Sequence, residues 1–191
     1  MQLRVKQIIK ESINIKQQLL SNDALLDTLS RVTDLCTIAF KANKKVLFCG
    51  NGGSAADAQH LATELAGRFY LDRAPLFAEA LNVNTSYLTA VANDYSFDEV
   101  FARLVRGKGQ KGDILFGLST SGNSTNVIRA FEQAKKQELI TIGMTGATGG
   151  QLRHASDFLL QVPSVDTPRI QEAHILLGHI ICELVEKNIF Q

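Results

Sequence analysis

From residue 44 onward, short apolar runs alternate with amphipathic segments, and this alternation limits the chain to very few folds. The runs predict strands because each is too short for a helix and nearly continuously apolar, at 44–50, 76–81, 113–118, 139–145 and 157–162. The segments between them have helical spacing, at 54–69, 86–92, 97–105 and 124–136, with a loop expected at Asn93–Asp94. Strands joined through helices form a mainly parallel sheet with both faces covered, so we predict an α/β fold.

Helical segments also precede the first strand. Residues 3–21 and 24–41 have amphipathic spacing, and Asp23 is the expected cap between them, beside Ser21 and Asn22. The N-terminus lacks the apolar core of a signal peptide, and no uninterrupted apolar stretch of the chain approaches the ~18 residues of a membrane span. We therefore expect a cytoplasmic protein with no membrane partner.

The last helix is predicted to begin near Pro168, because a proline's missing donor is not needed at a first helical position, and to reach about Lys187. Its stretch at 175–185 is apolar almost all round, which is typical of a helix inside a large core or an oligomer. In a chain of 191 residues we favour the oligomer.

Charge and cysteine usage exclude further classes. The net charge is +1, so no basic surplus predicts a nucleic-acid partner. Cys36, Cys49 and Cys182 are widely spaced among apolar neighbours, which indicates buried reduced thiols and neither a disulfide framework nor a zinc finger.

Ligands of open parallel sheets bind beyond the carboxyl ends of the strands, so the loops after the strands matter most. The first, GNGGS at Gly50–Ser54, lies between a predicted strand and a predicted helix. Its glycines permit a sharp turn and a close approach of a ligand to main-chain N–H groups, and Ser54 can cap the helix. It matches neither the dinucleotide fingerprint nor the P-loop, and alone it is explained equally well as a tight turn.

The second loop, STSGNS at Ser119–Ser124, predicts a phosphate site more strongly. It offers four hydroxyl groups and a glycine at the start of a predicted helix. Helix-terminal N–H groups, the helix dipole and the hydroxyls can converge on one anion there, whereas a helix cap needs only one hydroxyl. Because the loop has no lysine, we expect it to hold phosphate by hydrogen bonds more than by charge.

Histidines and carboxylates on two helices are candidates for metal binding or proton transfer. His60 and Glu64 are four residues apart and share a helix face, with Asp57 one turn earlier, although a surface pair is the commoner explanation of such spacing.

On the last helix, Glu172 and His179 are nearly eclipsed, within about 20°, whereas Gln171 and His179 are about 80° apart. Spacing alone therefore favours Glu172 as the partner of His179. His174 lies on the same helix, and a buried structural histidine is the simpler explanation of His179 when its helix is considered by itself.

Five ordered motifs resemble those of the phosphoheptose isomerases, single-domain members of the sugar isomerase (SIS) group. They are GNGGSAADAQHLATELAGRF at 50–69, Asn93-Asp94, STSGNSTNVIRA at 119–130, TGATGG at 145–150 and RIQEAHILLGH at 169–179. The resemblance implies one SIS domain over 1–191, with a helical segment at 1–43 and an α/β core at 44–191. It also implies a flavodoxin-like five-stranded parallel sheet between helices, assembled as a homotetramer. The implied activity converts sedoheptulose 7-phosphate to D-glycero-D-manno-heptose 7-phosphate, the first step toward the heptose of lipopolysaccharide core, capsules or surface layers.

The resemblance implies the site residues as well. One zinc ion per subunit would be bound by His60, Glu64, Gln171 and His179, so the family pattern selects Gln171 where helix spacing favours Glu172. The implied substrate contacts are Asn51, Gly52, Gly53, Glu64, Asn93, Asp94, Ser119, Thr120, Ser121, Ser124 and Gln171. In the expected enediol mechanism, Glu64 moves the carbon-bound proton and His179 serves the oxygens.

Two positions depart from the pattern of some family members. Ala55-Ala56 stand where some have His-Cys, and Pro168 stands where some have an aspartate, which puts any role of that aspartate in doubt here.

Two rival functions are also open. One is that of a catalytically silent relative that promotes assembly of the bacterial replication initiator; this sequence keeps Glu64 and His179, which argues for the enzyme. The other is isomerisation of a different sugar phosphate, because nothing in the loops measures sugar length.

Overall fold

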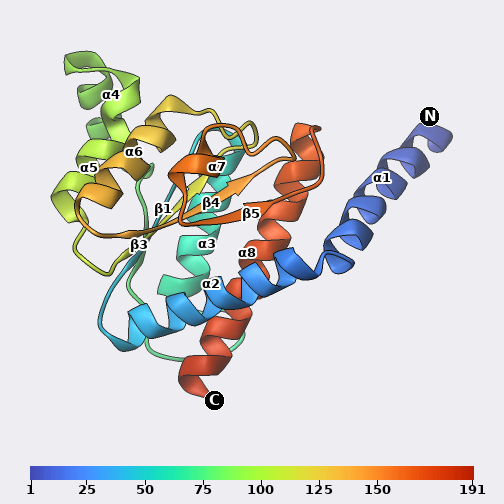
Figure 1. The fold of residues 1–191 in the computed structure, drawn as a ribbon, viewed down its shortest axis with the longest axis horizontal. Helices are drawn as coiled ribbons and strands as arrows, with labels where there is room; N and C mark the ends of the chain where they lie inside the picture. The colour runs from blue at the N-terminus through green and yellow to red at the C-terminus, as the bar shows by residue number, and fades with distance from the viewer.

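Five parallel strands form one sheet in the order β2-β1-β3-β4-β5, in a computed structural model that describes residues 1–191 (Figure 1). The strands are β1 (Val46–Gly50), β2 (Ala78–Ala80), β3 (Ile114–Leu118), β4 (Ile140–Thr145) and β5 (Phe158–Gln161). This is the flavodoxin-like strand order, and it confirms the predicted fold class. The chain leaves β1 toward β2 on one side and returns to β3 on the other. The carboxyl ends of β1 and β3 therefore form the switch point at which ligands of such sheets bind.

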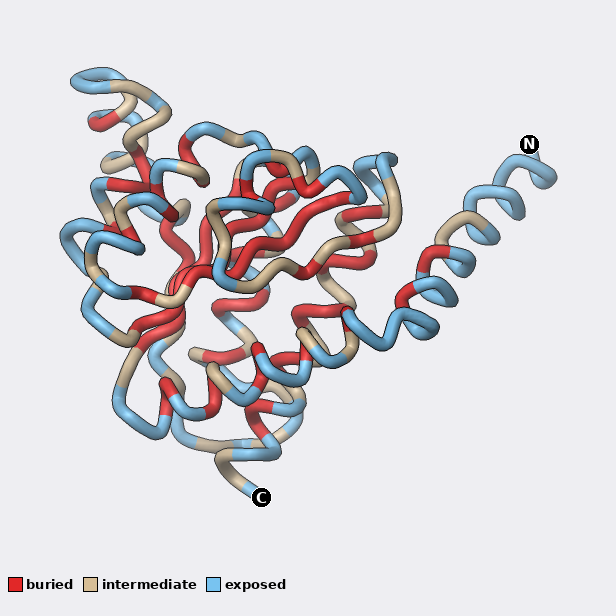
Figure 2. Tube along the Cα trace, viewed as in Figure 1, coloured by how far each residue is buried: buried red, intermediate tan, exposed pale blue.

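Helices cover both faces of the sheet. They are α1 (Gln2–Leu20), α2 (Asp23–Lys41), α3 (Gly53–Ala66), α4 (Thr85–Asp94), α5 (Val100–Lys108), α6 (Thr125–Lys136), α7 (Leu152–Ala155) and α8 (Thr167–Phe190), with a 3-10 turn at Phe97–Glu99. Because strand side chains alternate, Val46 and Phe48 join a core with α2, α3 and α8. Leu47 and Cys49 join a second core with α5 and α6. Both faces of the central strands are buried (Figure 2).

Helices α3 and α8 pack side by side in the same direction, and this pairing positions the candidate site. At the start of α3, a Cβ on Gly53 would lie 2.3 Å from Gln171 Nε2. Further along, a Cβ on Gly178 would lie 2.4 Å from Leu61 Cδ2. The absence of a side chain at Gly178 therefore lets the two helices approach closely beside His60 and His179, the sequence neighbours of Leu61 and Gly178.

Helix α1 projects from the body as an arm (Figures 1 and 2). Only Ile15 and Leu19 of this helix are buried. The exposed apolar side chains of the arm, which includes the cap residue Met1, are Met1, Leu3, Val5, Ile8, Ile9, Ile13 and Leu20. Most of the apolar surface of the arm is thus left uncovered by its own chain.

Several local predictions are wrong. Asn22, not Asp23, caps α2, because its side chain accepts from Leu25 N. Gly52, not Ser54, is the N-cap residue of α3; Ser54 is buried as the second residue of the helix. Asn93 and Asp94 form the end of α4 and not a loop.

Other predictions differ only in extent or are confirmed. The short helix α7 is absent from the predicted elements, and β2 is shorter than its predicted run. The three cysteines are free and buried, as predicted. No helix has the length and apolar character needed to cross a membrane.

Candidate active site

Two predicted ligand loops meet at the switch point of the sheet. Gly50 at the end of β1 pairs with Leu118 at the end of β3, so the loops that follow begin side by side. Asn51 and Asn126 join them, each amide donating to the other's side-chain oxygen at 2.9 Å. Gly52 has φ +55°, which favours glycine at this turn. Sequence reasoning misses Asn126, whose only signal is its place in the first turn of the helix after the serine loop.

The serine loop has the features of an anion site. Ser124 is the N-cap residue of α6, but its hydroxyl makes no cap hydrogen bond and lies 2.9 Å from the Ser119 hydroxyl. In the first turn of α6, Val127 N donates to Ser124 O at 3.0 Å, whereas the amides of Thr125 and Asn126 have no acceptor in the chain and remain available to a ligand. Thr120 is partly exposed and Ser121 is exposed. The hydroxyls of Ser119 and Ser124 therefore lie together at the start of α6, and phosphate binding by this loop stays a prediction.

The segment after β4 packs against the serine loop and forms backbone hydrogen bonds with it. Gly146 N donates to Thr120 O at 2.9 Å, and Leu152 N donates to Gly122 O at 3.0 Å. Gly122 has φ +69°, and a Cβ there would lie 2.1 Å from Gly149 O. Gly122 of the serine loop and Gly149 of the segment after β4 thus allow these two backbones to lie in contact.

Asn93 and Asp94 lie away from the two loops. They are exposed at the end of α4, where Asn93 Nδ2 donates to Asp94 Oδ1 at 3.0 Å. Helix α4 stands at the outer end of the molecule in Figure 1. No hydrogen bond connects this pair to the glycine or serine loop of its own chain.

Three metal-ligating side chains converge between α3 and α8. His60 Nε2 lies 2.8 Å from His179 Nε2 and 3.2 Å from Glu64 Oε1. The ligand atoms of His60, Glu64 and His179 all lie within 4.8 Å of one another. His60 is about half exposed, and the side chain of Glu64 is 19% exposed. His60 and Glu64, which spacing alone explains as a surface pair, are thus joined by His179 from a helix that is distant in sequence but packed against α3.

This group fits a divalent metal such as zinc. Two histidines and one carboxylate are a donor set that zinc uses in catalytic sites. Nitrogen ligands at zinc's usual bond length of about 2.0–2.1 Å lie roughly 3.4 Å apart in a tetrahedron. The observed 2.8 Å between the two histidine nitrogens is shorter, so a small separation of the two rings accommodates the ion.

The helix-spacing prediction for Glu172 is wrong. Glu172 forms an ion pair with Arg169, one turn earlier on α8. Gln171 lies beside Gly53, at the start of α3, while His60 is two turns further along that helix. The structure therefore brings together three of the four predicted metal ligands within one chain, and Gln171 lies nearer the glycine loop.

Two further titratable groups lie near these helices. Asp57 is half-buried, and burial raises the pKa of its carboxyl despite the opposing effect of His60. His174 is fully buried, with Nε2 3.3 Å from Thr145 O. Burial lowers the pKa of His174 to about 4, although the hydrogen bond to Thr145 opposes this effect. His174 is therefore a neutral core residue and does not belong to the metal group.

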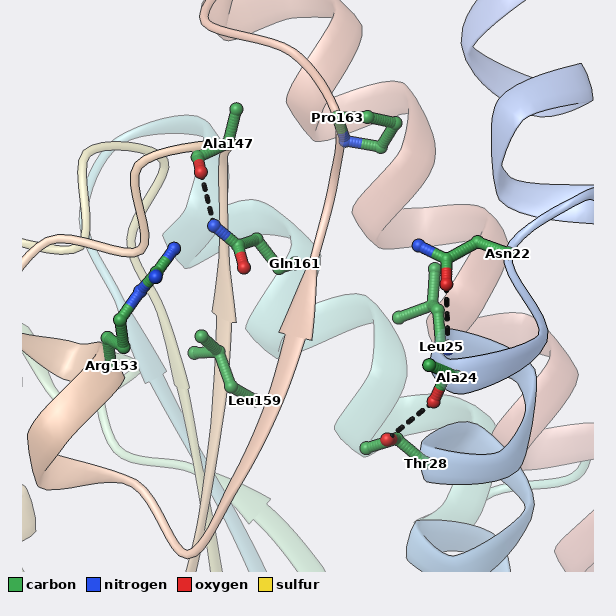
Figure 3. A pocket seen from close by; sticks show the side chains of 9 residues that line it. All are labelled: Asn22, Ala24, Leu25, Thr28, Ala147, Arg153, Leu159, Gln161 and Pro163. Carbon is green, nitrogen blue, oxygen red and sulfur yellow. Dashed lines mark hydrogen bonds between the residues drawn. The ribbon is translucent and has the colours of Figure 1, made fainter.

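A pocket of about 480 Å³ is lined by none of the predicted site residues (Figure 3). It is at the β5 edge, between the start of α2 and the segment after β4, and Figure 3 shows its lining side chains. Most of its polar groups bond to neighbours: Asn22 accepts from Leu25 N, Thr28 donates to Ala24 O and Gln161 donates to Ala147 O. It contains no convergent acid and base, so the candidate active site is the α3–α8 group with the two loops.

Comparison with known proteins agrees with this geometry. The family model described as "SIS domain" matches residues 9–146. The chain is 50% identical to a phosphoheptose isomerase of Sulfurimonas denitrificans, covering 97% of this chain and 95% of the relative. It is also 50% identical to one from Clostridium acetobutylicum, covering 95% and 93%.

Solved structures give the same result. A phosphoheptose isomerase from Neisseria gonorrhoeae superposes with TM-score 0.91 at 43% identity, covering 97% of this chain and 98% of that one. One from Francisella tularensis gives TM-score 0.93 at 34% identity, covering 98% and 99%. The chain belongs to the SIS domain family, in its phosphoheptose isomerase branch. It is therefore an isomerase.

Proposed function

We propose that this protein converts sedoheptulose 7-phosphate to D-glycero-D-manno-heptose 7-phosphate. The observation that carries the proposal is the convergence of Glu64 and His179 from two helices, in a chain that also has a separate loop suited to phosphate. The curated relatives named phosphoheptose isomerases support the choice of substrate. The product supplies heptose for the lipopolysaccharide core, a capsule or a surface layer, in the cytoplasm.

The exchange of ketose and aldose moves a proton between adjacent carbons through an enediol. A base must take the carbon-bound proton, and a second group must move protons between the two oxygens. Glu64 is the proposed base, because its carboxylate is only partly exposed and its backbone belongs to a helix that opens at the glycine loop. His179 is the proposed shuttle between the oxygens. The phosphate, bound remotely by the serine loop, orients the reacting carbons between them.

The same residues are the proposed metal site. His60, Glu64 and His179 would hold one zinc ion per subunit, with Gln171 as the fourth ligand that the family pattern implies. When bound, the ion would polarise the substrate carbonyl and hydroxyl as a Lewis acid. In its own chain Gln171 lies beside Gly53, so it would join either by rotating its side chain or from a second copy.

The remaining substrate contacts are proposed from the two loops and from α4. The glycine loop would contribute Asn51 and the backbone of Gly52 and Gly53, which are exposed at the start of α3. The phosphate would be bound by the hydroxyl groups of Ser119, Thr120, Ser121 and Ser124. Because Asn93 and Asp94 lie apart from these loops, they would reach substrate only through a movement of α4 or in a neighbouring subunit.

We further propose a homotetramer. The apolar side chains of α1 that its own chain leaves exposed support an assembly in which copies cover them. Ile38 on α2 and Leu184 on α8 are also exposed. Size-exclusion chromatography with light scattering tests this assembly, and a monomer would contradict it.

Incubation with sedoheptulose 7-phosphate, with and without zinc after chelation, tests the activity. We expect zinc-dependent formation of the aldoheptose phosphate. Glu64→Gln should lower kcat by about 100- to 10,000-fold because it removes the base. Glu183→Gln, on the outer surface of α8 and paired only with Lys187, is the matched control and should keep its activity.

Each contrary outcome has a definite meaning. Product without metal dependence would keep the reaction and remove the zinc assignment. Normal turnover by Glu64→Gln would overturn the role of Glu64. No product from folded wild-type protein would favour the catalytically silent binding protein, and product from a hexose or pentose phosphate alone would favour the other rival.

A further inference from the structure

A buried ion pair, Arg73–Glu186, joins the two helices that carry the proposed proton-transfer residues. Arg73 lies in the connection between α3 and β2, and Glu186 lies on α8, two turns after His179. Arg73 Nε is 3.0 Å from Glu186 Oε1, and the two side chains are 3% and 2% exposed. Desolvation offsets much of the attraction in such a pair, so stability alone explains it poorly.

Arg73 fixes the end of α3, where Glu64 lies. Its Nη2 donates to Glu64 O at 2.9 Å, and its Nη1 donates to Leu65 O at 2.7 Å and to Gly67 O at 3.0 Å. Carbonyls in the last turn of a helix have no intrahelical donor, and a cation there interacts favourably with the helix dipole. The guanidinium therefore binds the main chain of the proposed catalytic base itself.

Glu186 fixes the segment that follows α3. Its carboxylate accepts from the amides of Phe69 at 3.1 Å, Tyr70 at 2.8 Å and Leu71 at 3.0 Å. The Phe69 ring, held by this bond, has its centroid 5.6 Å from that of the His179 ring. Glu186 thus holds the main chain of Phe69, whose ring lies beside the proposed shuttle His179, while Arg73 holds the main chain of the proposed base Glu64.

We propose that Arg73 and Glu186 are positioning residues that set the distance between Glu64 and His179. The inference rests on the proposed function, because it concerns the residues named there as base and shuttle. The ion pair closes a continuous connection from the Glu64 main chain through Arg73 and Glu186 to α8, and through Phe69 to the His179 ring. Proton transfer and metal binding both need such groups held to within about 0.5 Å, so loosening this connection lowers both.

A second buried ion pair provides a matched control. Lys45 Nζ lies 2.6 Å from Asp113 Oδ2 at the opposite end of the sheet, where β1 and β3 begin. Asp113 also accepts from the amides of Lys45 at 3.1 Å and Gln110 at 2.7 Å. In each pair, removal of the cation leaves a buried carboxylate, Glu186 or Asp113, that still accepts from backbone amides. Only the Arg73 pair is connected to Glu64 and His179.

The experiment compares Arg73→Met with Lys45→Met in the full-length protein. Both variants should lower Tm, Arg73→Met by more because it also removes the donor to three main-chain carbonyls. Below both transitions, Arg73→Met should lower kcat by about 10- to 100-fold, with KM for sedoheptulose 7-phosphate changed by less than about threefold. In the metal-stripped protein, chelator competition should show zinc affinity weakened by about 10- to 100-fold. Lys45→Met should leave kcat and zinc affinity unchanged.

If Arg73→Met lowers Tm as Lys45→Met does but keeps wild-type kcat and zinc affinity, the positioning role is wrong. Should Arg73→Met fail to fold, Arg73→Lys and Lys45→Arg repeat the comparison. Lysine keeps the charge beside Glu186 but lacks the fork that reaches several carbonyls at once, so unchanged kcat and zinc affinity in Arg73→Lys would also overturn the proposal. If the wild-type protein does not isomerise the heptulose phosphate, the proposed function fails, and the difference in zinc affinity still decides the role of Arg73.

Discussion

Replacing His174 by glutamine should remove a large part of the acid sensitivity of this protein. His174 is 0% exposed in α8, and its Nε2 faces Thr145 O at the end of β4. A glutamine amide can donate to the same carbonyl but does not titrate. The variant therefore keeps a hydrogen-bonding group of similar reach and loses only the protonation equilibrium.

The magnitude follows from the shift in pKa. Burial lowers the pKa of His174 from 6.5 to about 4 in the folded protein, while the unfolded chain keeps an ordinary histidine. Between these two values the unfolded state binds a proton that the folded state does not, so the free energy of unfolding falls as pH falls. At about 1.4 kcal/mol per pKa unit, the loss over this window is about 3 kcal/mol.

Urea unfolding of wild type and His174→Gln at about pH 7.5 and pH 4.5 measures this effect. Protein concentration must be held constant, because the proposed assembly would make stability concentration-dependent. Glu186, whose pKa is lowered by the amides of the 69–71 segment and by Arg73 although burial opposes this, also costs stability in acid, but it does so in both proteins. The wild type should lose about 2–3 kcal/mol more than the variant over this range. Equal losses would show that the His174 ring gains its proton without unfolding, and would refute the reasoning.

Three further outcomes are expected. Ser124→Ala should raise KM about tenfold or more with little change in kcat, in steady-state kinetics, because it removes one hydroxyl from the proposed phosphate site. Gly122→Ala should lower stability by roughly 1–3 kcal/mol in urea unfolding, since φ is +69° and a Cβ would lie 2.1 Å from Gly149 O; wild-type stability would contradict this. Ile9→Asn, in the exposed arm, should shift the size-exclusion profile toward smaller species while circular dichroism stays unchanged.

The sheet is predictable from sequence because its central strands are buried on both faces. Every residue of β1 and β3 is buried, so each strand gives a continuous apolar run in the sequence. Each run ends where the ligand loop begins. Asn93 and Asp94 mislead because these residue types favour turns, whereas here they form the last residues of a helix. The four-residue helix α7 is too short to show any periodicity.

The candidate site is only half predictable, for a physical reason. His60 and Glu64 share one helix, so spacing reveals them. The partnership of His60 with His179 depends on how α3 and α8 are staggered, which no single helix encodes. Spacing also selects Glu172 wrongly as the partner of His179, because the carboxylate of Glu172 pairs with Arg169, one turn earlier on the same helix. The position of Gln171 beside Gly53 is likewise determined only by the packing of α8 against α3.

The lengths of the outermost strands have a consequence for how copies of this protein can associate. β2 has three residues and β5 has four, and these two strands form the edges of the sheet. Such short edges offer few free backbone groups, so they are poor templates for strand addition by another chain. Growth of the sheet from one molecule into the next is thereby discouraged, and association is directed to helical surfaces, where side-chain shape selects the partner.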